Sequence, residues 1–405
     1  MSTTHVATSE TGSAEATPTV WILVLALSVG GAERTIVELV NGMDGDRFDI
    51  EVWTVFDANP LAESLDDDVT LRTLGVTATR GEEPYEITGA ANPLEYLSAP
   101  LSFVAAVRRE RPAVLHSFLF YDNVVARFAG VVSPGTTVVT GERGFHNASR
   151  PLSQAVDRAT MGLSDVIVSN SRAGAEYYAA HGFDREDLRV IRNGRDLSAY
   201  RDGVGDGIRA EFGVSADAPV VGTVGRLVER KGHDELLHAF ARVTDSVSDA
   251  QLLVVGHGPE RSSLEATARE LGIEGQVHFT GGREDVPALL DAMDLFAFPS
   301  YWEGLPGALQ EAMAAGLPTV ATRVDGTDEL VTHGETGLLV PAKDPAPLAD
   351  AIERLLTDTE AARALGERAQ TEAFTEYTRE RMVAEFQSLY ADLTDAAASR
   401  AGWSA

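Results

Sequence analysis

The 405-residue sequence contains no cysteine and only two lysines, Lys231 and Lys343. Without cysteine, the chain can form neither a disulfide framework nor a thiolate nucleophile. Long apolar runs are also missing, and the longest one near the start, VWILVLAL, is far too short to span a bilayer. No basic segment precedes this run, so it predicts a buried first strand rather than a signal peptide. We therefore expect a cytoplasmic protein.

Basic residues are scarce as a class. The sequence has 33 lysines and arginines against 62 acidic residues, and its formal net charge is −29. This balance argues against nucleic acid as a partner, because phosphate backbones need clustered cations. An acid-rich, lysine-poor surface suits a halophile, since concentrated salt screens the repulsion between like charges. The alternative interpretation is an ordinary acidic protein from a GC-rich genome.

Strand-like apolar runs alternate with helical patterns from about residue 18 onward, which predicts an α/β fold. Residues 1–17 lack periodicity and predict a disordered tail. The turn-rich stretch RVIRNGRD, followed by RDGVGDG, is the best linker in the chain and divides a domain of residues 18–197 from one of residues 198–376. Two doubly wound parallel sheets fit this order, with a ligand crevice at the carboxyl ends of the strands. Apolar residues at helical spacing predict a last helix over residues 377–397: Met382, Phe386, Leu389, Tyr390 and Leu393.

Two of the loops between a strand and a helix carry groups that suit an anionic ligand. In SVGGAER, Gly31 allows close approach of the backbone at a helix N-terminus. In VGRLVERKGHDEL, Arg226 offers a planar fork for phosphate and Lys231 a point charge. Glycine packing and a solvated cation are the plainer alternatives. The sequence has neither the dinucleotide-binding G-x-G-x-x-G nor a Walker A loop.

A third loop, in YWEGLPGALQEAMAAGLPTV, places a glycine turn between two acids. Gly304 and Leu305 can aim backbone N–H groups at a phosphate. Glu303 precedes the helix and Glu311 lies in its second turn, and a carboxylate can accept from two vicinal hydroxyls. One acid could hold a sugar and the other a ribose, which matches the polarity of a nucleotide sugar. Helix capping is the alternative for either glutamate taken singly.

The second half of the chain resembles the glycosyltransferase family 4 (group 1) retaining transferases of GT-B fold. The resemblance rests on VGRLVERKGHDELLHAF, LLVVGHGPERSSLE, VHFTGGREDVPALL, FPSYWEGLPGALQEAMAAGLPTVAT and ETGLLVPAKDP, and in the first half on SVGGAER, VLHSFLFYDN and VIRNG. It covers roughly residues 19–395. It implies two Rossmann-like domains facing a cleft, with the last helix returning to the first domain.

The resemblance also implies roles for individual residues. Arg226 and Lys231 would hold the diphosphate, Glu311 the ribose and Glu303 the transferred sugar. No cofactor or metal would be needed, because cations and backbone amides stabilise the leaving diphosphate, which helps to deprotonate the acceptor on the donor's front face.

Some features depart from the family or leave alternatives open. The family often has a histidine where Phe118 stands, so His116 is either catalytic or a core residue, and His146 is an alternative histidine for the cleft. The run Asp66-Asp67-Asp68 predicts a surface turn rather than a metal site. The basic cluster Arg108, Arg109 and Arg111 follows an apolar helix, whose end either contacts anionic lipid or is simply solvated.

We expect a metal-independent glycosyltransferase of hexosyltransferase type that moves a sugar, with retention, from a nucleotide-diphosphate sugar to an acceptor hydroxyl in glycan, polysaccharide or glycolipid assembly. A lipid-linked glycan is one candidate acceptor, and it would bring the protein to the inner membrane face. The alternatives are a nucleotide-sugar epimerase of the same fold and an inactive nucleotide-sugar-binding protein.

Overall fold

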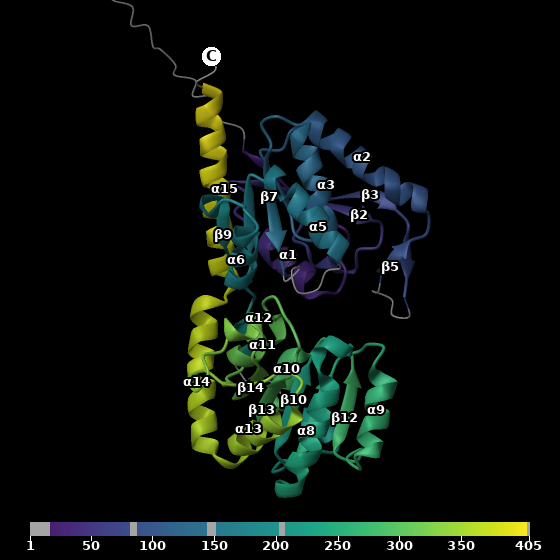
Figure 1. Ribbon diagram of the computed structural model, residues 1–405, viewed down its shortest axis with the longest axis vertical. Helices are drawn as coiled ribbons and strands as arrows, with labels where there is room; N and C mark the ends of the chain where they lie inside the picture. Colours follow the sequence, from purple (N-terminus) through teal and green to yellow (C-terminus); the bar gives the residue numbers. More distant parts are fainter. Residues whose placement is uncertain (1–16, 82–86, 144–150, 202–206, 403–405) are drawn as a thin grey trace, which may run out of the picture.

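A computed structural model describes residues 17–81, 87–143, 151–201 and 207–402. The predicted disordered tail therefore lies almost entirely outside the described residues. The chain folds into two α/β domains, each built on a parallel sheet flanked by helices (Figure 1). The predicted fold class, two Rossmann-like parallel-sheet domains, is confirmed.

The first domain has a seven-stranded sheet in the order β3-β2-β1-β6-β7-β8-β9. Its central strands are apolar and buried on both faces, as expected where helices cover both sides of a parallel sheet. A small antiparallel pair, β4 and β5, was not predicted. The strands are β1 (Thr19–Val24), β2 (Asp49–Phe56), β3 (Thr70–Val76), β4 (Ala78–Arg80), β5 (Ile87–Ala90), β6 (Val114–Ser117), β7 (Thr137–Glu142), β8 (Val166–Ser169) and β9 (Leu188–Val190), and the helices are α1 (Gly31–Asn41), α2 (Pro93–Glu110), α3 (Phe120–Val131), α5 (Pro151–Thr160) and α6 (Arg172–Ala180).

The second domain has a six-stranded sheet in the order β12-β11-β10-β13-β14-β15. Its strand β10 pairs with both β11 and β13, so the order of the sheet reverses direction there. Such a reversal opens a crevice at the carboxyl ends of the two strands. The strands are β10 (Val220–Val224), β11 (Gln251–Val255), β12 (Val277–Gly281), β13 (Leu295–Phe298), β14 (Thr319–Thr322) and β15 (Leu338–Val340), and the helices are α7 (Ile208–Glu211), α8 (His233–Ser246), α9 (Arg261–Glu270), α10 (Val286–Asp291), α11 (Gly307–Ala314), α12 (Asp325–Asp328), α13 (Pro345–Thr357) and α14 (Thr359–Glu376).

The last helix, α15 (Arg379–Gly402), returns to the first domain, and Figure 1 shows it running alongside that domain above α14. All five residues predicted at helical spacing pack there against the core formed by β1, β6 and α1. The chain thus crosses between the domains twice, and the crossings touch: the amide of Arg195 donates to the carbonyl of Tyr377 at 3.0 Å. A Cβ atom on Gly194 would overlap the carbonyl oxygen of Thr378, so this close approach requires glycine. Among the described residues, no helix is both long and apolar enough to cross a membrane.

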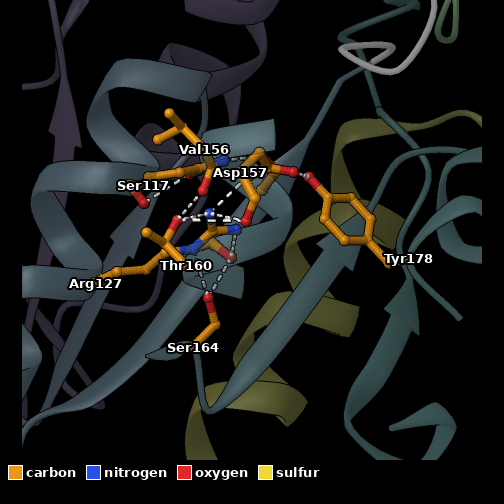
Figure 2. A network of polar contacts seen from close by, with 10 residues as sticks. Ser117, Arg127, Val156, Asp157, Thr160, Ser164 and Tyr178 are labelled. Atoms are coloured by element: carbon orange, nitrogen blue, oxygen red, sulfur yellow. Dashed lines mark hydrogen bonds and ion pairs between the residues drawn. The ribbon is translucent and has the colours of Figure 1, made fainter. Parts of the chain in front are cut away.

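A buried polar network stabilises the first domain (Figure 2). Arg127 of α3 forms an ion pair with Asp157 of α5 at 2.6 Å, and both side chains are almost fully buried. Tyr178 of α6 donates to the same carboxylate at 2.7 Å, while the Arg127 Nε donates to Ser164 at 2.9 Å. A buried ion pair is tolerated only when its remaining donors and acceptors are satisfied in this way. The network therefore connects helices α3, α5 and α6.

Candidate active site

Two loops of the second domain meet because their strands are neighbours. One follows β10 and contains Arg226 and the short 3-10 helix Glu229–Lys231; the other follows β13 and leads into α11. The amide of Tyr301 donates to the carbonyl of Arg230 at 2.8 Å and joins the two loops. The predicted basic loop and the predicted acid turn, about 70 residues apart in the sequence, therefore form one surface at the carboxyl ends of the strands.

At this meeting point, Lys231 and Glu303 form an ion pair. The Lys231 Nζ lies 2.6 Å from the Glu303 Oε1, and Arg230 Nη1 reaches the same oxygen at 3.3 Å. The Lys231 side chain is 13% exposed and that of Glu303 is 9% exposed. Burial lowers the pKa of Lys231, and the neighbouring Arg230 lowers it further, although Glu303 opposes both effects. The pair therefore consists of two incompletely solvated charges that compensate each other.

From the sequence, Lys231 was predicted to bind the diphosphate and Glu303 the sugar, with no contact between the two side chains predicted. The structure brings both side chains to one point. An ammonium group has three donors, so the bond to Glu303 leaves two for a phosphate. Arg230 was missed in the sequence analysis, although it stands directly before Lys231. Its guanidinium packs 4.5 Å from the ring of Trp302 and points its charge at Glu303.

Arg226 lies across from the first domain, near Glu33 in the first turn of α1. The Glu33 carboxylate accepts from the Ser28 hydroxyl at 3.0 Å. Burial raises the pKa of Glu33, and the positive charge of Arg226 partly offsets that rise. Glu33 was not predicted, although it belongs to the motif SVGGAER. Gly31, the first residue of α1, is exposed with open space beside its Cα, so a ligand can approach the backbone there.

The second predicted acid, Glu311, lies on α11 and pairs with Arg195 at 3.0 Å. Arg195 belongs to the segment that crosses between the domains, and its backbone is fixed by bonds to Tyr377 and Arg379. The sequence analysis treated Arg195 only as part of a linker. Its position shows that the linker contributes a cation to the carboxylate expected to hold a ribose. Glu303 and Glu311 thus have cationic partners from different parts of the chain.

The glycine turn between the two acids packs against the core of the second domain and against α12. Leu305 is buried in the core of the second domain, while Gly304 is partly exposed. A Cβ atom on Gly326 of α12 would overlap the Gly304 carbonyl, so glycine lets α12 pack directly beneath the turn. Within the described residues, the backbone amides of Gly304 and Leu305 make no hydrogen bond. They are therefore available as donors to an anion.

One further contact joins the domains beside this turn. Glu329, at the end of α12, accepts hydrogen bonds from the backbone amides of Arg172 and Ala173 at 2.9 and 3.1 Å. These amides are the first two of α6 in the opposite domain, where a carboxylate is favoured by the helix dipole. The element beneath the Gly304 turn is thus anchored to the first domain.

The position of His116 does not support a catalytic role. The side chain is fully buried, its Nδ1 lies 2.7 Å from the Tyr390 hydroxyl of α15, and its ring stacks on Phe118 at 4.1 Å. Burial, with a contribution from nearby Arg143, keeps its pKa well below the ordinary value, so the ring is neutral. A substrate cannot reach it, and we remove His116 from the catalytic set. The alternative, His146, lies outside the described residues.

The acidic run Asp66-Asp67-Asp68 is exposed in the loop before β3, where a surface turn was predicted. In the parts of the chain that the structure describes, no three acidic or histidine side chains come together in a metal-binding arrangement. Neither observation identifies a metal ligand.

Two family models match the chain. The model described as "Glycosyl transferases group 1" matches residues 206–372, and "Glycosyltransferase Family 4" matches residues 29–199. A relative from Rhizobium meliloti, the lipopolysaccharide core biosynthesis glycosyltransferase LpsE, is 31% identical over 74% of this chain and 81% of its own. The N-acetyl-alpha-D-glucosaminyl L-malate synthase of Bacillus anthracis is 32% identical over 51% of this chain, which spans about half of that relative's length (54%).

Solved structures support the same fold. The Anabaena Alr3699/HepE protein, crystallised with UDP and glucose, superposes with a TM-score of 0.78 at 23% identity, over 93% of this chain and all of that one. The sucrose-phosphate synthase of Thermosynechococcus elongatus gives a TM-score of 0.77 at 23% identity, over 94% of this chain and all of that one. At this level of identity the likeness establishes the architecture.

Proposed function

The chain belongs to the group 1 glycosyltransferases, and from this premise we propose that it transfers a hexose, with retention, from a nucleotide-diphosphate sugar to an acceptor hydroxyl. The observation that carries the proposal is the meeting of Lys231, Arg230 and Glu303 at the carboxyl ends of β10 and β13. Cations beside backbone amides that make no hydrogen bond suit a diphosphate, and an adjacent carboxylate suits sugar hydroxyls.

Each group has a defined role in this proposal. The Lys231 ammonium and the amides of Gly304 and Leu305 bind the diphosphate and stabilise the charge that grows on it as the glycosidic bond breaks. Arg226 adds a planar cation from the same loop. These groups do the work of a metal ion in charge stabilisation, so we propose a metal-independent reaction.

The two acids divide the rest of the donor between them. Glu311 accepts from the ribose hydroxyls, and its ion pair with Arg195 at 3.0 Å orients the carboxylate. Glu303 accepts from hydroxyls of the transferred sugar after exchanging part of its contact with Lys231 for the donor. The leaving phosphate takes the proton of the acceptor hydroxyl, which approaches from the first domain on the same face of the sugar. The acceptor belongs to glycan, polysaccharide or glycolipid assembly.

A panel of nucleotide sugars tests the proposal. UDP-glucose should be included first, because the Alr3699/HepE protein has been crystallised with it. The productive donor should raise the melting temperature, and transfer in the presence of EDTA should give a product whose anomeric configuration matches that of the donor by NMR. Loss of transfer in EDTA that added metal restores would refute metal independence, and an inverted product would refute retention.

The same panel separates the alternatives. A nucleotide-sugar epimerase would release free or epimerised sugar from the donor alone, without an acceptor. An inactive binding protein would show the thermal shift but neither hydrolysis nor transfer.

A further inference from the structure

We propose that the outer face of α2, together with part of α3, docks the protein onto an anionic lipid surface. The most exposed leucines of α2 are Leu94, Leu97 and Leu101, which are 75%, 70% and 72% exposed. Their spacing of three and four residues places them on one side of the helix. The opposite side packs in the core through Ala99, Phe103, Ala106 and Val107. The helix is therefore apolar on both sides, and one apolar side has no partner within the chain.

The neighbouring helix α3 also carries exposed apolar side chains. Phe128 and Val131 of α3 are 52% and 59% exposed. The two helices pack together, and the Ser133 hydroxyl, just after α3, donates to the Val107 carbonyl near the end of α2 at 3.3 Å. We define the α2 face as Leu94, Leu97, Leu101, Phe128 and Val131. Figure 1 shows α2 along the outer surface of the first domain.

The charge beside this face identifies the occupant. Three arginines lie at the end of α2: Arg108 and Arg109 in its last turn, and Arg111 directly after it. Arg108 follows Leu101 by seven residues and therefore lies on the same side of the helix. The segment from Pro93 to Arg111 contains these three arginines and only two glutamates, one of which, Glu110, pairs with Arg109. The chain as a whole has a net charge of −29. A basic protein partner would be attracted more strongly to the acidic surface elsewhere on the molecule. A row of exposed leucines followed by arginines instead suits an anionic membrane, because the leucines can enter the acyl boundary and the arginines can bind the headgroups.

The position of α2 gives this docking a consequence for the proposed transfer. In its first turns, the Tyr96 ring stacks between Phe56 and Tyr121, at centroid distances of 5.8 and 5.1 Å. Phe56 ends β2 and Tyr121 begins α3, so this end of α2 lies at the carboxyl edge of the first sheet. A membrane on the α2 face would therefore lie near the carboxyl edge of the first sheet, in the domain from which the acceptor is proposed to approach. Given the proposed transfer, the acceptor would then meet the enzyme at a lipid surface.

Vesicle flotation tests the inference directly, with the full chain and no donor sugar, so that the result does not depend on catalysis. The wild-type protein should float with vesicles that contain phosphatidylglycerol and bind pure phosphatidylcholine more weakly. The combined variant Leu94→Gln, Leu97→Gln, Leu101→Gln should lose binding at least about tenfold, because three apolar contacts are removed. The matched control is Leu152→Gln on α5, which changes a leucine that is 77% exposed but outside the α2 face.

Salt separates the two parts of the surface. Arg108→Gln with Arg109→Gln should weaken binding to phosphatidylglycerol vesicles at low salt and change little in molar KCl, where the attraction is already screened. The leucine variant should remain defective in both. Circular dichroism and melting curves verify that each variant is folded.

Three results would overturn the inference. The first is a wild-type protein that ignores both kinds of vesicle, and the second is a leucine variant that floats like the control. The third is light scattering in which the wild type is a dimer that the leucine variant dissolves, since the face would then bind a second copy of the chain. Failure of donor binding would instead count against the proposed function and leave the flotation result standing.

Discussion

Two buried ion pairs among the described residues, one in each domain, differ in how completely their polar groups are paired. In the first domain, the Arg127–Asp157 pair is 0% and 1% exposed, and Ser164, Thr160 and Tyr178 satisfy its other donors and acceptors. In the second domain, the Lys231–Glu303 pair is 13% and 9% exposed and lies at the open ends of the strands. The polar groups of the Arg127–Asp157 pair already have partners within the fold. The Lys231 ammonium group, in contrast, has donors left for a ligand after its bond to Glu303.

Burial alone does not distinguish a structural ion pair from one that can bind a ligand. Both pairs are short, at 2.6 Å, and both connect distant segments of the chain. What differs is the number of remaining groups that already have partners. A saturated pair stabilises the fold, while an unsaturated pair beside open backbone amides can exchange its partner for a ligand.

The largest effect should come from breaking the saturated pair. Asp157→Ala leaves the Arg127 guanidinium buried without its counter-charge, and we expect a loss of about 3–5 kcal/mol in the free energy of unfolding. Urea denaturation measures this loss. The control is Glu367→Ala, which breaks the exposed pair with Arg363 on α14 and should cost under about 1 kcal/mol. Equal losses in the two variants would show that the buried Arg127–Asp157 pair stabilises the fold no more than an exposed pair does.

Breaking the second pair should affect catalysis more than stability. Lys231→Ala should raise the barrier for kcat/KM by about 2–4 kcal/mol, the scale of losing one preorganised charge contact at the diphosphate. The melting temperature should change little, because Arg230 still reaches Glu303. The control is Arg363→Ala, a cation 70% exposed on α14. An active Lys231→Ala enzyme would show that this pair is structural after all.

The two glutamates of the site should respond differently. Glu311→Ala should remove the proposed ribose contacts and weaken binding of free nucleoside diphosphate about tenfold, or about 1.4 kcal/mol. Glu303→Ala should leave that affinity nearly intact and lower turnover, because its sugar contacts matter as charge develops at the anomeric carbon. Calorimetry with the diphosphate beside turnover with the full donor distinguishes the two, and equal losses of diphosphate affinity would refute the assigned polarity.

The effect that is smallest per pH unit concerns a buried histidine in the first domain. His116 has a lowered pKa and stays neutral in the fold, whereas the unfolded chain binds a proton below about pH 6.5. The unfolded state therefore holds more protons below that pH, and stability should fall as pH drops from 7 to 5. His116→Gln should flatten this decline by about 1 kcal/mol per pH unit, since one titrating group contributes at most about 1.4. Urea midpoints at several pH values measure it, and identical slopes in both proteins would place the acid sensitivity elsewhere, for instance at His233, whose pKa burial lowers to about 3.

Much of the architecture was predictable because it depends on local patterns. Buried parallel strands are continuous apolar runs, and the glycine turns between them appear directly in the sequence. The last helix was predicted from five apolar residues at helical spacing, and all five pack as expected. The short antiparallel pair of β4 and β5 was missed, because its strands are brief and mostly polar.

The site was predicted less completely, since its contacts join distant residues. Arg195 was overlooked because a residue in a linker carries no sign of the helix it will meet. His116 was an open choice until its contact with Tyr390, 274 positions away, put it in the core. The exposed leucines of α2 are regularly spaced like core residues, and only the packed structure shows that Leu94, Leu97 and Leu101 point outward.

The sequence by itself determined the alternation of strands and helices, the two sheets, and the loops with Arg226, Lys231, Glu303 and Glu311. These follow from periodicity and turn chemistry, which act over a few residues. The tertiary structure alone decided the partners: Lys231 and Arg230 with Glu303, Arg195 with Glu311, and Arg226 facing Glu33. The physical reason is that a charged side chain pairs with whatever the strand order and the domain crossings bring within reach, and neither is written in any local pattern.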